Sequence, residues 1–224
     1  ADMSLEEAQR AKKRHIAKKL RIEPGMRVLD IGCGWGGMAL TLARDYGAKV
    51  EGVTLSKEQH AVAVERAREQ GLEGQVEFRL QDYREVTGTF DRIVSVGMFE
   101  HVGVPHYSDF FGFVNTHLAE DGLALIHTIG HTCPPNDGDP WLAKYIFPGG
   151  YSTTLGEIMK AVDKHSLVPG DVEALRVHYA LTLAAWYDRF MANVDEARAL
   201  YDERFVRMWR YYLLAAEATF LRGG

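Results

Sequence analysis

The sequence predicts an α/β fold with a doubly wound, mostly parallel sheet flanked by helices. Between residues 5 and 129, apolar segments of strand length alternate with segments of helical periodicity, a pattern that favours parallel strands joined by helical crossovers. The first of these strands runs directly into a glycine-rich turn, Gly32–Gly37. Such a turn between strand and helix brings backbone close to a nucleotide-like ligand in α/β proteins.

The composition is that of one folded domain spanning residues 1–224. Hydrophobic residues make up 46% of the chain and charged residues 25%, enough for a full core. The net charge of −5 gives no support to nucleic-acid binding, and no apolar run reaches the roughly 20 residues of a membrane span. Cys33 and Cys133 have no metal-binding spacing, so we expect no metal site and a reducing, cytoplasmic compartment.

A basic helix is expected over about residues 1–22, opened by a capping box of Ser4 and Glu7 and ended by the turn at Pro24. Its basic residues form either a solvated face or a surface that attracts anionic lipid headgroups. They are Arg10, Lys12, Lys13, Arg14, His15, Lys18, Lys19 and Arg21.

The remaining elements of the sheet follow in order. We expect strands at about 27–31, 49–54, 75–80, 90–96 and 122–129, and helices at about 36–46, 56–70 and 108–118. The strand at 90–96 is almost wholly apolar, which is typical of a strand buried on both faces.

The pattern changes after residue 130. Residues 131–150 are rich in proline, glycine and aromatic side chains without a clear period, and so long an irregular segment is usually functional. We expect the segments at about 130–165 and 179–222 to form a helical, aromatic-rich cover over the substrate. A late strand is expected at 168–177.

Ligands of open α/β sheets bind beyond the carboxyl ends of the strands. Asp30 stands just before Gly32 and Gly34 at the first of these ends. An acid there suits a ligand with a charged amine, such as S-adenosylmethionine, and thus favours methyl transfer. The alternative is an ordinary turn that needs glycine for a positive φ.

Other strand ends carry groups that suit the same ligand. Thr54 and Gln59 are placed to reach its ribose or methionine end, Asp82 its adenine amino group and Tyr83 its adenine ring, and Gly97 follows the fourth strand. Gln59 and Asp82 also suit a purely local role as caps of a helix or turn.

Several longer motifs resemble those of cyclopropane-fatty-acid synthases, a bacterial family. They lie at residues 28–37, 52–56, 90–103, 127–130, 144–150, 185–190 and 201–205, so the resemblance extends over essentially the whole chain. It implies a class I S-adenosylmethionine-dependent methyltransferase fold. It also implies an enzyme at the inner membrane face that adds a methylene bridge across a cis double bond of a phospholipid acyl chain.

The resemblance further implies a bound bicarbonate ion that serves as the base. Its ligands in the family match Glu100, His127, the backbone amide of Ile129, and Tyr179. In the family a cysteine also binds the ion, and no residue of this sequence matches it. Family members also have further segments at both ends. Glu100 would accept a hydrogen bond from the bicarbonate hydroxyl, and the other groups would donate to its oxygens. Alternatively, Glu100 caps a helix, and His127 and Tyr179 are core residues.

Aromatic residues of the cover are expected to line the acyl channel or to stabilise a carbocation through their ring faces: Tyr145, Phe147 and Tyr151. Three other functions remain open: a 10-methyl or methylene-branched fatty acid methyltransferase, a small-molecule methyltransferase, and a non-catalytic lipid- or cofactor-binding module. The sequence leaves the oligomeric state open, with a homodimer among the alternatives.

Overall fold

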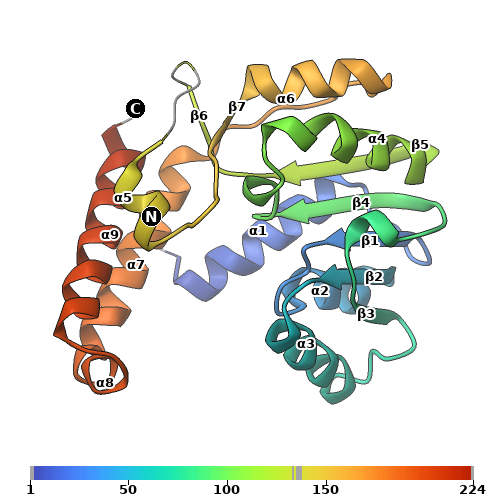
Figure 1. The fold of residues 1–224 in the computed structure, drawn as a ribbon. Helices are drawn as coiled ribbons and strands as arrows, with labels where there is room; N and C mark the ends of the chain where they lie inside the picture. The colour runs from blue at the N-terminus through green and yellow to red at the C-terminus, as the bar shows by residue number, and fades with distance from the viewer. Residues whose placement is uncertain (1–2, 133, 135–137, 223–224) are drawn as a thin grey trace. The chain divides into compact units, whose positions relative to one another are not determined.

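The computed structural model describes residues 3–132, 134 and 138–222, so Cys133 lies outside the described residues. The chain divides into two compact units. The sheet unit comprises Arg10–Gly130 and Gly150–Val168, and the helical unit comprises Ala1–Gln9, His131–Gly149 and Pro169–Gly224. Each unit is described by itself below (Figure 1).

The sheet unit contains a five-stranded sheet in the order β3-β2-β1-β4-β5, and all of its strand pairs are parallel. The strands are β1 (Arg27–Ile31), β2 (Lys49–Thr54), β3 (Val76–Leu80), β4 (Phe90–Val96) and β5 (Leu118–His127). Strand order reverses between β1 and β4, which confirms the doubly wound topology and places the ligand-binding crevice of such folds at this pair.

Helices cover both faces of this sheet (Figure 1). Alternate residues of β1 point to opposite faces: Val28 packs with α1, α2 and α3, whereas Leu29 and Ile31 pack with α4 and α6. These helices are α1 (Leu5–Lys19), α2 (Gly37–Tyr46), α3 (Lys57–Glu69), α4 (Tyr107–His117) and α6 (Leu155–Val162). Short helical turns follow the strands: η1 (Tyr83–Glu85), η2 (Phe99–His101), η3 (Val104–His106) and, after α6, η4 (Asp163–His165).

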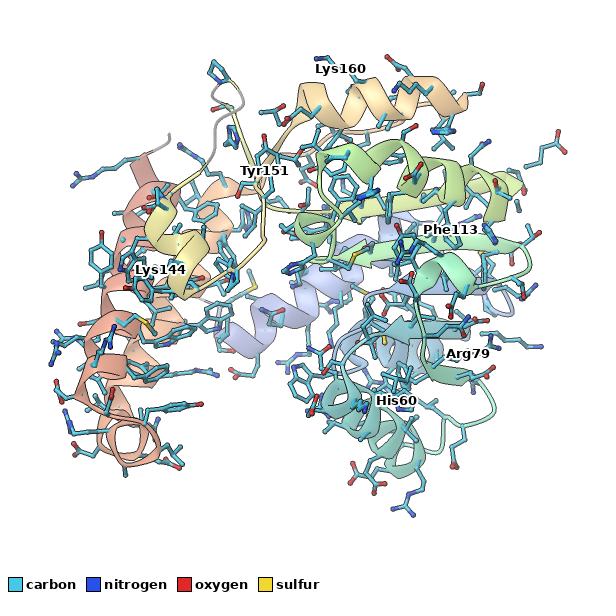
Figure 2. All side chains as sticks on the ribbon, viewed as in Figure 1. His60, Arg79, Phe113, Lys144, Tyr151 and Lys160 are labelled. Atoms are coloured by element: carbon cyan, nitrogen blue, oxygen red, sulfur yellow. The ribbon has the colours of Figure 1, made fainter. Side chains whose placement is uncertain are left out.

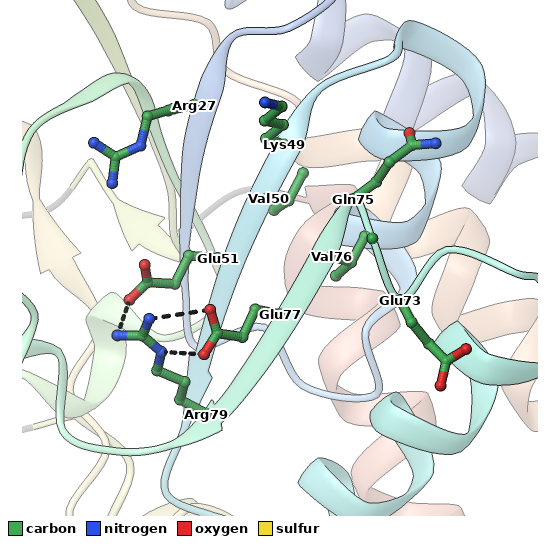
Figure 3. A pocket seen from close by; sticks show the side chains of 10 residues that line it. Arg27, Lys49, Val50, Glu51, Glu73, Gln75, Val76, Glu77 and Arg79 are labelled. Carbon is green, nitrogen blue, oxygen red and sulfur yellow. Dashed lines mark hydrogen bonds and ion pairs between the residues drawn. The ribbon is translucent and has the colours of Figure 1, made fainter.

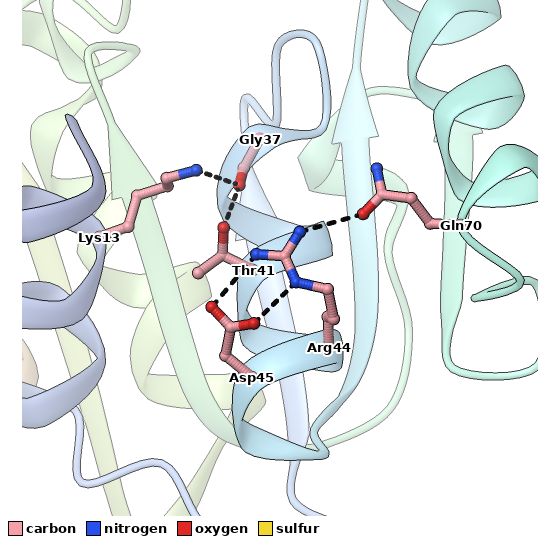
Figure 4. Close-up of polar contacts among 6 residues, drawn as sticks. All are labelled: Lys13, Gly37, Thr41, Arg44, Asp45 and Gln70. Atoms are coloured by element: carbon pink, nitrogen blue, oxygen red, sulfur yellow. Dashed lines mark hydrogen bonds and ion pairs between the residues drawn. The ribbon is translucent and has the colours of Figure 1, made fainter. Parts of the chain in front are cut away.

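Polar contacts attach α1 to α2 (Figure 4). The ammonium of Lys13 donates to the carbonyl of Gly37 at 3.4 Å, and the Thr41 hydroxyl donates to the same carbonyl at 2.8 Å. Ile16 and Ala17 of α1, and Leu20 directly after it, are buried in the same core cluster as α2. These apolar and polar contacts fix α1 against the start of α2.

The helical unit contains α5 (Pro140–Tyr145), α7 (Arg176–Ala192), α8 (Val194–Leu200) and α9 (Glu203–Arg222). Its core centres on the buried Leu183, Tyr212 and Leu213, surrounded by aromatic side chains of α5, α7 and α9. The expected helical and aromatic-rich character of residues 179–222 is therefore confirmed. Two-residue strands complete the described elements, β6 (Gly130–His131) and β7 (Thr153–Thr154).

The late strand expected at 168–177 is wrong. Residues 169–175 form no helix or strand, and α7 begins at Arg176. The side chains of Val168 and Val172 are 90% and 60% exposed, so these β-branched residues lie in an exposed irregular segment that also contains Pro169 and Gly170. Among the described residues, no helix has both the length and the apolar character needed to cross a bilayer.

Candidate active site

The turn between β1 and α2 requires glycine and leaves its backbone open. Gly32 has φ of +77°, and a Cβ built on it would lie 2.7 Å from the Cβ of Met98. Gly34 has φ of +55°, with nothing within 4 Å of its Cβ position, and Gly97 after β4 is open in the same way. Bare backbone thus borders free space on both sides of the β1–β4 crevice.

Asp30 lies beneath this turn and is buried, with 2% of its surface exposed. One carboxylate oxygen has no hydrogen-bond partner among the described residues. Burial raises the pKa of Asp30 to about 7, although a bond from the Ala39 backbone opposes the shift. A buried carboxylate with a free oxygen lacks a cationic partner, so this site fits a ligand with a charged amine.

The residues after β2 are tied to one another. The Thr54 hydroxyl donates to the Gln59 side-chain oxygen at 3.2 Å, while the Ser56 hydroxyl accepts from the Gln59 backbone amide and caps α3. The local capping role of the Gln59 position therefore coexists with a side chain that points back to the strand end.

The residues after β3 also have local partners. The Asp82 carboxylate accepts from the Arg84 backbone amide at 2.9 Å and pairs with the Arg84 guanidinium at 2.6 Å, and the pKa of Asp82 is lowered mainly by that side-chain bond. The ring of Tyr83 contacts Phe110 and Phe113 of α4 edge to face, at 5.5 and 5.2 Å between centroids.

Glu100, His127 and Ile129 come together at the ends of β4 and β5. Val96 pairs with His127 in the sheet register, and Glu100 lies in η2 directly beyond β4. The Ile129 backbone amide donates to one carboxylate oxygen of Glu100 at 2.7 Å. The other carboxylate oxygen and the Nδ1 atom of His127 are buried and have no partner among the described residues.

The surroundings of His127 favour its neutral form. Burial lowers its pKa, and the positive charge of Lys12 lowers it further, against an opposing effect of Glu100. A neutral imidazole has one donor and one acceptor nitrogen, so it can bind either a hydroxyl or an anion.

Tyr151 holds Glu100 from a third segment of the sheet unit. Its backbone amide donates to the Glu100 carbonyl oxygen at 3.0 Å. Its hydroxyl donates to the Glu157 carboxylate at 3.0 Å, and the same carboxylate completes the capping box of α6 with Thr154. Tyr151, labelled in Figure 2, therefore has a structural role beside the one predicted from the sequence.

Tyr179, Tyr145 and Phe147 belong to the helical unit. Tyr179 contacts Phe220 edge to face at 4.9 Å between centroids. The side chains of Tyr145 and Phe147 are 38% and 41% exposed.

Two residues near the Glu100 group were not identified from the sequence. Tyr107 is buried and stacks on Phe99 with 4.4 Å between ring centroids. Burial raises its pKa, and the charges of Glu157 and Glu100 add to that effect. Lys12 acts on His127 as described above. Tyr107 resembles any core aromatic of an amphipathic helix, and Lys12 lies within a basic run, so neither stands out in the sequence.

A polar hollow lies elsewhere on the sheet unit, lined largely by the first residues of β1, β2 and β3 (Figure 3). Arg79 fills part of it, paired with Glu51 at 2.9 Å and Glu77 at 2.8 Å. The hollow is at the amino ends of the strands, away from the ligand edge of such sheets. No group of three or more potential metal ligands occurs in the part of the chain that the structure describes.

Comparison with known proteins identifies related sequences along the whole chain. A family model described as mycolic acid cyclopropane synthetase matches residues 1–224. Cyclopropane-fatty-acyl-phospholipid synthase of Escherichia coli (strain K12) is 47% identical over 217 residues, which are 97% of this chain and 56% of that protein. The chain spans about half the length of the first curated relatives that it matches.

Solved structures agree with these matches. A cyclopropane synthase from Mycobacterium tuberculosis has a TM-score of 0.91 and 33% identity, over 98% of this chain and 82% of its own. A mycolic acid cyclopropane synthase complexed with SAH and CTAB has a TM-score of 0.91 and 32% identity, with the same coverage. The fold is that of class I S-adenosylmethionine-dependent methyltransferases.

Proposed function

Because the chain belongs to the mycolic acid cyclopropane synthetase family, we propose that it carries the active site of a cyclopropane-fatty-acyl-phospholipid synthase. The reaction is S-adenosylmethionine-dependent methylene transfer to a cis double bond of a phospholipid acyl chain. The observation that carries the proposal is the group of Glu100, His127 and Ile129 beside the open glycine turn, with two buried polar atoms that lack partners.

The residues of the crevice fit the cofactor. Asp30 offers a buried carboxylate oxygen to the amine of the methionine end, and the open backbone at Gly34 and Gly97 leaves room for the ligand. Thr54, Gln59, Asp82 and Tyr83 bind its remaining groups in this proposal, with Asp82 still paired to Arg84. The bound cofactor supplies the electrophilic methyl group.

The residues around Glu100 fit a bicarbonate ion. The unpartnered carboxylate oxygen of Glu100 would accept a hydrogen bond from the hydroxyl of the ion, and the unpartnered Nδ1 of His127 would also hold it. The Ile129 amide already donates to Glu100, so its bond to bicarbonate must be shared with that carboxylate. Tyr179 is the fourth ligand of the proposal. Bicarbonate, when bound, supplies the base that removes a proton from the alkylated acyl chain.

The protein has two tasks besides holding these groups, because an alkene is a weak nucleophile. It must align the double bond with the methyl group and exclude water from the cation that forms. We assign both tasks to the helical cover, with Tyr145 and Phe147 of the helical unit, together with Tyr151, lining the acyl channel.

The enzyme is proposed to act at the cytoplasmic face of the inner membrane as a peripheral protein. The exposed basic residues of α1 provide a surface for anionic headgroups: Arg10, Arg14, His15 and Lys18. Each basic residue near such a surface contributes about 1 kcal/mol of attraction.

The experiment that tests the function follows the acyl chain. The full-length protein is incubated with labelled S-adenosylmethionine and vesicles of cis-unsaturated phospholipid, and the acyl chains are analysed by mass spectrometry. We expect a gain of one CH2 per chain, lost in Glu100→Gln. Fragmentation separates a cyclopropane ring from a methyl or methylene branch. Cofactor binding without an acyl product would refute the lipid reaction and favour a small-molecule or non-catalytic role.

A further inference from the structure

Lys12 lies on the buried side of α1, within the sheet unit. It precedes Ile16 and Leu20 at intervals of four residues, so the three share one side of the helical path, and Ile16 and Leu20 are buried in the core beneath the sheet. The side chain of Lys12 is itself half-buried. Its position thus differs from that of Lys18 on the same helix, which is exposed.

The ammonium of Lys12 has no hydrogen bond or ion pair within residues 3–132, 134 and 138–222. Its neighbour Lys13, in contrast, donates to the Gly37 carbonyl. Burial lowers the pKa of Lys12, and the charge of Lys13 adds to this effect, with no acidic group opposing it. A half-buried cation without a counter-ion is unfavourable, and an anion that binds beside it relieves this cost.

The site beyond β4 and β5 needs such a cation. Glu100 places a negative charge there, and burial favours the neutral form of His127. A second anion beside Glu100 is disfavoured by like-charge repulsion unless a positive charge lies near.

Lys13, adjacent to Lys12, reaches the Gly37 carbonyl just beyond β1, so this turn of α1 lies at the carboxyl edge of the sheet. On β5, His127 follows Leu123 and Leu125 at intervals of two, and both leucines pack against the cluster that contains Ile16 and Leu20. Lys12 and His127 therefore share one side of the sheet at this edge, and the charge of Lys12 lowers the pKa of His127. Both Glu100 and His127 retain a buried atom without a partner.

We propose that the ammonium of Lys12 binds a carboxylate-type anion in the space next to His127 and Glu100. The anion is bicarbonate if the proposed function holds, and identifying it as bicarbonate rests on that function. The other source of the same chemistry is the α-carboxylate of the cofactor. The two sources are distinguished by the arms of the experiment.

The first measurement tests the position of Lys12 without any ligand. The pKa of His127 is followed by NMR in histidine-labelled protein, with its signal assigned through His127→Gln. Lys12→Met is expected to raise the pKa of His127, because the variant removes a nearby positive charge. Lys12→Arg keeps the charge and Lys18→Met removes a charge from the exposed side of the same helix, so both should leave the pKa near the wild-type value. The charged groups that act on His127 are Lys12 from α1 and Glu100 from η2.

The second measurement tests anion binding. Sodium bicarbonate is titrated into cofactor-free protein at constant ionic strength while the His127 signal is recorded, and SAH binding is measured by calorimetry. If the anion is bicarbonate, Lys12→Met weakens bicarbonate binding at least ten-fold and leaves SAH affinity within about three-fold. If it is the cofactor carboxylate, the effects are reversed. Lys12→Arg and Lys18→Met should behave as wild type in both arms.

Unchanged affinities for both ligands in Lys12→Met would overturn the proposal, as would an unchanged His127 pKa. This failure differs from failure of the proposed function, which is read from the acyl product of the wild-type protein. Lys12-dependent bicarbonate binding in a protein that makes no acyl product would keep the anion site and reject the lipid reaction.

Discussion

Asp30 makes the stability of the cofactor-free protein depend on pH in a direction opposite to that of a paired carboxylate. Its pKa is about 7 in the folded chain, against an ordinary value of 3.8. The unfolded chain therefore loses this proton first as the pH rises. The stability that Asp30 contributes is fully present below pH 3.8 and is lost as the pH rises through about 7.

The magnitude follows from the two pKa values. The whole difference corresponds to roughly 4 kcal/mol at 1.36 kcal/mol for each pH unit, and roughly 2 to 3 kcal/mol of it falls between pH 5 and pH 8. Asp30→Asn removes the ionisation and keeps the size of the side chain. We therefore expect the variant to gain roughly 2 to 3 kcal/mol relative to wild type between pH 5 and pH 8.

The assay is urea unfolding of both proteins at several pH values, without cofactor. The difference between the two unfolding free energies cancels the titration of all other groups. Calorimetry with SAH provides the second readout. The affinity of the wild type should increase as the pH rises through 7, since the ionised carboxylate of Asp30 pairs with the amine of the ligand. Asp30→Asn should bind SAH weakly, with little change in affinity over the same pH range. A stability difference that stays flat from pH 5 to pH 8 would refute the reasoning.

Three further changes test other parts of the structure. Gly32→Ala should destabilise the protein by about 1 to 3 kcal/mol, because the φ of Gly32 is +77° and its Cβ position is occupied. Gly37→Ala is the control, since Gly37 is at an open position without positive φ. Equal melting temperatures of the two variants would contradict the argument. Tyr151→Phe removes the hydroxyl that donates to Glu157 and should cost about 1 kcal/mol in chemical denaturation; an unchanged midpoint would show that solvent replaces this bond. Charge reversal on the exposed side of α1 combines Arg10→Glu, Arg14→Glu and Lys18→Glu. The variant should sediment less with anionic vesicles and bind neutral vesicles as the wild type does. Unchanged binding to anionic vesicles would reject this surface.

The sheet was largely predictable from the sequence because its strands contain apolar or alternating residues and most of them adjoin turn glycines. The expected strands at 27–31, 49–54 and 90–96 have the observed bounds. The expected strand at 168–177 failed because its β-branched residues Val168 and Val172 lie in an exposed loop, where no neighbouring strand pairs with them. Sequence pattern reports a preference for extended backbone, and only the remainder of the fold decides whether a partner strand exists.

The candidate site was predictable only in part. Asp30, Glu100 and His127 stand at strand ends, and a parallel sheet places such ends at one edge, so their proximity follows from topology. The bond between the Ile129 amide and Glu100 joins residues 29 positions apart in the chain and depends on the exact path of two loops. Lys12 was hidden among other basic residues of α1, because the sequence alone does not say which side of a helix meets the core.

The bond from the Ile129 amide has a further consequence for binding at Glu100. Together with the bond from the Tyr151 amide to the Glu100 carbonyl, it restricts both the backbone and the side-chain torsions of this residue before any ligand arrives. Immobilising a free glutamate side chain costs about 1 to 2 kcal/mol of conformational entropy. Here that loss is part of folding, so the free carboxylate oxygen is already oriented and a ligand binds it without the loss.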